Sequence, residues 1–78
     1  MIVYHVTSAK KLNKYRKSGG ILPPVRAWET IQAAQRFSIN TGRPIILRLK
    51  FPNDAPKLVG HFNQARVLET MFKFNGGF

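Results

Sequence analysis

The segment from residue 44 to residue 51 constrains the fold more than any other part of the chain. Apolar side chains occupy every second position, and two basic side chains stand between them: Ile45, Leu47, Leu49 and Phe51 alternate with Ile46, Arg48 and Lys50. A period of two predicts a β-strand with one core face and one partly basic face. One strand cannot bury an apolar face alone, so the remaining residues must supply partner strands and a covering layer.

Other segments predict such partners. Residues 1–6 are β-branched and aromatic, which predicts a strand with Val3 and His5 on one face and Tyr4 on the other. Residues 25–28 follow Pro23-Pro24 and predict a very short edge strand. Residues 52–56 predict a turn, and residues 57–63 an irregular segment or short strand. Residues 66–74 fit helical or strand periodicity, and their Thr, Val and Phe content favours a strand.

Two helices complete the pattern. The first is predicted over residues 9–17, with Thr7 or Ser8 as the N-cap and Gly19-Gly20 ending it. The second is predicted over residues 31–38, with Thr30 as the N-cap and residues 40–42 ending it. The sequence therefore predicts one α+β domain over residues 1–78, in which two short helices pack on a small twisted sheet.

The amino-acid composition excludes several kinds of functional site. The 78 residues contain no cysteine, which excludes disulfides, a thiol nucleophile and cysteine-ligated metals. Two histidines and three scattered carboxylates are too few for a metal cage made by protein side chains alone, so we expect no metal. No apolar run approaches the ~20 residues of a spanning helix, and the start does not resemble a signal peptide, so we expect a cytoplasmic protein without a membrane partner.

The net charge of +10 predicts an anionic partner. The predicted helix 9–17 carries lysines but no acid that could pair with them along the helix, which is compatible with phosphate binding. The alternative is that these lysines form a solvated basic face without a ligand. A basic sheet face on the central strand would add a platform, without the aromatic residues that stack on bases. The candidate phosphate contacts are Lys10, Lys11, Lys14, Lys17, Arg26, Arg43, Arg48 and Lys50.

A few polar and aromatic residues are candidates for a ligand site. His5 follows Tyr4 on the first strand, just before a helix N-terminus, where anions are received; alternatively Tyr4 lies in the core and His5 caps the sheet edge. Trp28 could stack on a base or a nicotinamide ring, or could be a core side chain. Glu69 could stabilise a developing cation or orient a ribose hydroxyl, or could pair with a surface cation. Gln64 is a further polar candidate.

The segments Val3-Tyr4-His5-Val6-Thr7 and Gly19-Gly20-Ile21-Leu22-Pro23 resemble the opening of the ADP-ribosyltransferase-like fold. The resemblance continues through residues 25–28, Ala33-Ala34-Gln35-Arg36-Phe37 and the strand at 45–49, and so covers about residues 3–51. It implies that His5 hydrogen-bonds the ribose of NAD and that Gln64 or Glu69 matches the catalytic position. Trp28 would fall near the position that packs on nicotinamide, where tyrosine or serine is usual. The chain is shorter than typical catalytic members.

The expected function is therefore a minimal ADP-ribosyltransferase-like domain that binds an anionic ligand, NAD or nucleic acid, with transfer activity left open. If the domain is catalytic, His5 and Glu69 carry the reaction, and Tyr4, His5, Trp28 and Gln64 contact the cofactor. The alternatives are a non-catalytic nucleic-acid-binding module and a small protein–protein adaptor. The C-terminal segment, residues 75–78, could pair with a second copy to form a homo-oligomer.

Overall fold

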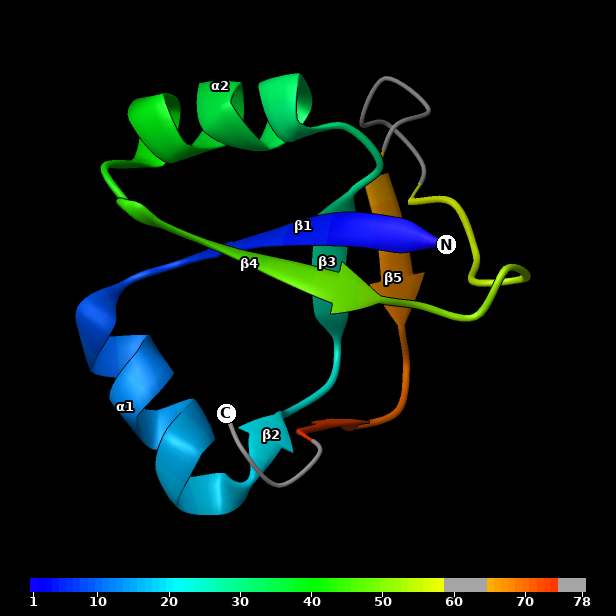
Figure 1. Cartoon of the computed structure of the whole chain (residues 1–78), viewed down its shortest axis with the longest axis horizontal. Coiled ribbons are helices and arrows are strands. Elements are labelled where there is room, and N and C mark those ends of the chain that lie inside the picture. The colour runs from blue at the N-terminus through cyan, green and yellow to red at the C-terminus, as the bar shows by residue number, and fades with distance from the viewer. Residues whose placement is uncertain (59–64, 75–78) are drawn as a thin grey trace.

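A four-stranded antiparallel sheet forms the centre of the molecule in the computed structural model, which describes residues 1–58 and 65–74 (Figure 1). Its strands are β1 (Ile2–Thr7), β3 (Val25–Trp28), β4 (Ile45–Lys50) and β5 (Ala65–Leu68), in the order β4-β1-β3-β5. Two short strands, β2 (Gly20–Ile21) and β6 (Phe72–Lys73), pair separately. The predicted α+β class and the shared sheet of the first and central strands are confirmed.

The two helices begin and end where cap chemistry requires. Helix α1 (Ala9–Ser18) begins after Ser8, whose hydroxyl accepts a hydrogen bond from the Lys11 amide. Helix α2 (Ile31–Thr41) begins after Thr30, which accepts from the Ala33 amide. Each helix ends at a glycine in the left-handed conformation, Gly19 and Gly42, as a C-cap without a Cβ allows. Helix α2 is longer than predicted and includes residues 39–41.

The main core lies on one face of the sheet. Val3 and Leu49 meet there across the β1–β4 ladder, and β2 packs Ile21 on the same side. The full cluster contains Val3, Ile21, Val25, Ala27, Leu49, Phe51 and Ala55. Helix α2 packs against β1, β3 and β4, and its Ala34 is fully buried. The sheet is therefore stabilised mainly by apolar burial, the dominant favourable term in folding.

Two strand predictions are wrong in detail. The strand at 25–28 is not an edge strand, because β3 lies between β1 and β5. The prolines that suggested an edge precede the strand and take no part in its ladder, so the amides of residues 25–28 remain available on both sides. The segment 66–74 is not one strand: β5 ends at Leu68, and β6 belongs to the second sheet.

Some expectations fall on residues that the structure does not describe. Gln64, most of the irregular segment 57–63 and the proposed pairing tail at 75–78 lie outside the described residues. Within the described part of the chain, no helix is long and apolar enough to cross a membrane.

Candidate functional site: a cleft between β1 and β3

Strand β1 is paired very differently along its two edges. Six residue pairs join it to β4, from Ile2 with Lys50 to Thr7 with Ile45. Its register with β3 contains one pair, Tyr4 with Trp28. The ladder between β1 and β3 is therefore short, and the two strands part beyond this pair.

The direction of each backbone group on β1 follows from the ladder. Met1 and Phe51 exchange backbone hydrogen bonds of 2.7 and 2.8 Å, so alternate residues from Met1, including His5, bond towards β4. The N–H and C=O groups of Tyr4 and Val6 consequently face β3. Continuing the antiparallel register past Tyr4 and Trp28 would pair Val6 with Arg26. Val6 and Arg26 instead line a cleft.

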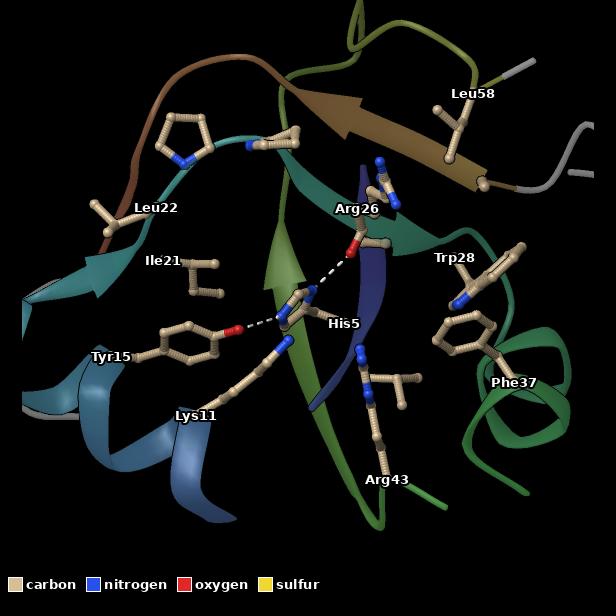
Figure 2. Close-up of a pocket in the computed structure, with 15 residues that line it drawn as sticks. His5, Lys11, Tyr15, Ile21, Leu22, Arg26, Trp28, Phe37, Arg43 and Leu58 are labelled. Carbon is tan, nitrogen blue, oxygen red and sulfur yellow. Dashed lines mark hydrogen bonds between the residues drawn. The ribbon is translucent and has the colours of Figure 1, made fainter. Parts of the chain in front are cut away.

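The His5 side chain occupies one of the positions that the missing ladder bond would fill. His5 Nδ1 lies 2.6 Å from the Arg26 carbonyl oxygen, which fixes Nδ1 as the protonated donor nitrogen. His5 Nε2 lies 3.2 Å from the Tyr15 hydroxyl on α1. The imidazole thus bridges the split from β3 to α1, as the dashed lines in Figure 2 show.

Burial keeps this imidazole neutral. Burial lowers the pKa of His5 from its usual value of 6.5; the hydrogen bond to the Arg26 carbonyl raises the pKa, and the charges of Lys11 and Arg43 lower it further. At neutral pH, Nε2 therefore accepts a hydrogen bond from Tyr15. Thr7, which is fully buried, donates to the same tyrosine oxygen at 3.4 Å. The result is a directed chain from Thr7 through Tyr15 and His5 to the Arg26 carbonyl.

The cleft has a volume of about 360 Å³ and two kinds of wall. Trp28 on β3 and Phe37 on α2 form an aromatic wall, with ring centroids 5.3 Å apart and planes tilted by 47°. An apolar wall on the other side follows β2 and the chain after it: Ile21, Leu22, Pro23 and Pro24. The volume lies in the range of small-molecule sites, and the planar rings offer stacking surfaces.

Three cations also line the cleft, and none of the described lining residues is a carboxylate: Lys11, Arg26 and Arg43. Figure 2 shows Lys11 from α1 and Arg43 from the chain before β4 directed towards His5. Arg66 Nε bonds Glu29 Oε2 at 3.0 Å, and neither residue of this ion pair is among the described lining residues. The cleft is therefore electropositive and its histidine is uncharged, a combination that suits an anionic ligand with an aromatic part.

The structure gathers part of the predicted site. His5, Trp28, Lys11, Arg26 and Arg43 all line the cleft. The alternative placement, with Tyr4 in the core and His5 at the sheet edge, is wrong. Tyr4 is half-buried on the opposite face of β1, whereas His5 is buried between two neighbouring strands.

The remaining predicted residues lie outside the cleft. Glu69 is exposed just after β5 and is not among the lining residues. The other basic candidates form two groups, both exposed: Lys10, Lys14 and Lys17 on α1, and Arg48 and Lys50 on β4. The strand alternation places the last two on the face of Tyr4, away from His5.

The lining residues that were not predicted as site residues include Val6, Tyr15 and Phe37. Tyr15 shares the apolar side of its helix with Leu12, so its hydroxyl was the available signal of a polar partner opposite. Phe37 lies at helical spacing from Ile31 and Ala34, a pattern that is equally typical of a core residue. Val6 contributes its backbone, and the role of this backbone depends on where the ladder between β1 and β3 ends.

No protein-family model, no curated protein and no solved structure matches this chain. The ADP-ribosyltransferase-like resemblance therefore stays a prediction.

Proposed function

We propose that this protein binds a nicotinamide dinucleotide in the cleft between β1 and β3. The carrying observation is the interrupted ladder, in which Val6 and Arg26 form no register pair and both line a cleft. A carboxamide group carries one carbonyl acceptor and an NH₂ donor in one plane, so it can pair with both groups of Val6 as a neighbouring strand would. The resemblance to the ADP-ribosyltransferase-like fold supports the same ligand.

The positive charges of the cleft favour binding of the dinucleotide's phosphates. Lys11 and Arg43 approach His5 from different elements, and both lower the pKa of its imidazole through their positive charge. A pyrophosphate bound between them would replace this mutual repulsion of cations by charge-assisted hydrogen bonds. Arg26 at the rim adds a third cation. The neutral His5 could hydrogen-bond a ribose hydroxyl in place of Tyr15.

The aromatic wall offers side chains on which the ring systems of the ligand can stack. Trp28 and Phe37 both line the cleft, and base–aromatic stacking contributes about 1–3 kcal/mol per base. The proposal is limited to binding. A transfer step with an oxocarbenium-like transition state needs a carboxylate beside the ribose, and none of the described lining residues supplies one.

Trp28 makes the proposal directly measurable, because it is the only tryptophan of the chain and stands in the cleft wall. We expect NAD to change its fluorescence saturably and to raise the melting temperature. Arg43→Gln should weaken NAD binding about 10-fold or more, the value of a lost charge-assisted hydrogen bond. Arg48→Gln removes the same charge from a residue that does not line the cleft and should change the affinity less than 2-fold. The Arg43 amide and carbonyl both bond Ser38, so the substitution leaves the backbone contacts in place.

A ligand analogue isolates the contribution of Val6. In 3-acetylpyridine adenine dinucleotide a methyl group replaces the amide NH₂, so the charge and the carbonyl acceptor remain while the donor is lost. We expect roughly 3- to 10-fold weaker binding than NAD, the value of one hydrogen bond. Absence of any fluorescence or melting response to millimolar NAD would refute the proposal. Equal weakening by Arg43→Gln and Arg48→Gln would refute the placement in the cleft.

A further inference from the structure

A second basic feature lies on α1, outside the cleft. Lys10, Lys14 and Lys17 follow one another at i, i+4 and i+7, so they form one row along the helix. All three are exposed, the helix buries none of its residues, and its first turn has no acid. Among the elements in the described part of the chain, α1 makes its principal contacts with β2. Figure 1 shows α1 projecting away from the four-stranded sheet.

We propose that this row, which we call the lysine row, docks the phosphate backbone of a nucleic acid. From Lys10 to Lys17 the helix rises about 10 Å. That length corresponds to about three intervals between successive phosphates of one strand, at about 3.4 Å per charge along a duplex. Lys11 neighbours the row and lines the cleft, so the row is continuous with the electropositive site. The proposal does not rest on dinucleotide binding, because none of its three lysines lines the cleft.

The composition of the row favours nucleic acid over other anionic partners. A helix that lies on a membrane turns leucine and aromatic side chains towards the lipid, but Leu12 and Tyr15 of α1 are half-buried against the protein. A stable interface with an acidic protein needs apolar or aromatic anchors at its centre, and the row itself contains only lysines. Point charges on long side chains suit repeated phosphates read without sequence preference.

The test compares two triple variants of equal charge. Lys10, Lys14 and Lys17 are changed to Gln in one, and the exposed Arg36, Arg48 and Lys50 are changed to Gln in the other; each lowers the net charge of +10 by three. Glutamine has nearly the helix propensity of lysine, so α1 should remain folded, which circular dichroism and melting temperature check. Binding of a labelled 20-nucleotide single strand is followed by anisotropy at several salt concentrations.

We expect the lysine-row variant to lose at least 10-fold in affinity at low salt and the control variant less than 3-fold. The slope of log K against log salt should fall in magnitude by about 2 in the first variant, since each lost contact to a single strand contributes about 0.7. Equal losses in the two variants would overturn the proposal and leave net charge as the cause. Absence of binding to single or double strands at low salt would also overturn it, as would equally tight binding to polyglutamate or anionic vesicles.

The proposals for the cleft and for the lysine row can be tested separately. The lysine-row variant should bind NAD as the unmodified protein does, and saturating NAD should leave the strand bound. Loss of NAD binding in Arg43→Gln with the strand still bound concerns the cleft alone. A strand displaced fully by NAD, with the lysine-row variant unaffected, would place the nucleic acid in the cleft and overturn the docking proposal.

Discussion

The two edges of β1 differ in what they contribute. Towards β4 the strand forms six register pairs, extended by the exchange between Met1 and Phe51. Towards β3 it forms one pair, and a histidine side chain bonds the carbonyl that the next pair would have used. The first edge satisfies the backbone and supports the core, whereas the second stops after one pair, and Val6 and Arg26 beyond it line a cleft. A single strand thus supplies both stability and a candidate site, because antiparallel pairing sends alternate residues to opposite edges.

The largest difference between the two edges should appear in the cost of truncating an aromatic side chain. Phe51, 2% exposed, ends the β4 edge within the core, and Phe51→Ala should cost about 3–5 kcal/mol. Small domains have about 5–15 kcal/mol in total, so much of the stability would be lost. Phe37 in the cleft wall is half-buried, and Phe37→Ala should cost roughly half as much. Chemical denaturation measures both, and equal costs would contradict the division into a structural edge and a binding edge.

The acid dependence of stability should come from the open edge. Burial holds the pKa of His5 below 6.5 in the folded protein, whereas the unfolded chain takes up a proton at about 6.5. The unfolded state therefore binds more protons as pH falls below 6.5, and the free energy of unfolding should decrease. The decrease ends once the pH passes below the folded pKa. Its slope is at most about 1.4 kcal/mol per pH unit.

The control for this dependence is a variant with a side chain that does not titrate. His5→Gln should be less stable than the unmodified protein at pH 7, because glutamine does not reproduce both imidazole bonds. Between pH 6.5 and the folded pKa, however, its stability should lack the His5 contribution to the slope. Chemical denaturation at a series of pH values tests this, and an unchanged slope in His5→Gln would show that other groups cause the acid dependence.

The same comparison explains how far the sequence led. Local rules were sufficient for the elements, because Ser8 and Thr30 cap their helices and glycines end them. The apolar alternation at 44–51 correctly predicted a strand that shares a sheet with residues 1–6, and the structure shows the two strands as direct neighbours. The cations of the site were also present in the predictions, as was His5. These features depend on residue type and short spacing, which a sequence shows directly.

The parts that the sequence did not reveal depend on the ladder's limits. The point where β1 parts from β3 follows from tertiary packing, and no pattern in residues 1–6 or 25–28 marks it. The backbone of Val6 therefore could not be assigned a role, and β3 was wrongly placed at an edge. Tyr15 lies ten residues after His5 in the sequence, and the contact between them depends on how α1 is oriented relative to the sheet. Glu69 was selected because carboxylates are scarce, yet scarcity carries no information about position.

The smallest expected effect is also the most direct measure of the two edges. The amide of His5 bonds towards β4, and the amide of Val6 faces the cleft, although both residues are buried in the same strand. Hydrogen exchange followed by NMR should therefore show a several-fold lower protection factor for Val6 than for His5, equivalent to about 1 kcal/mol. Saturating NAD should raise the protection of Val6 and leave that of His5 unchanged, since only Val6 gains a hydrogen-bond acceptor. Equal protection of the two amides without ligand would mean that the Val6 amide already has a partner across the split. The cleft would then lack the backbone donor on which carboxamide recognition depends.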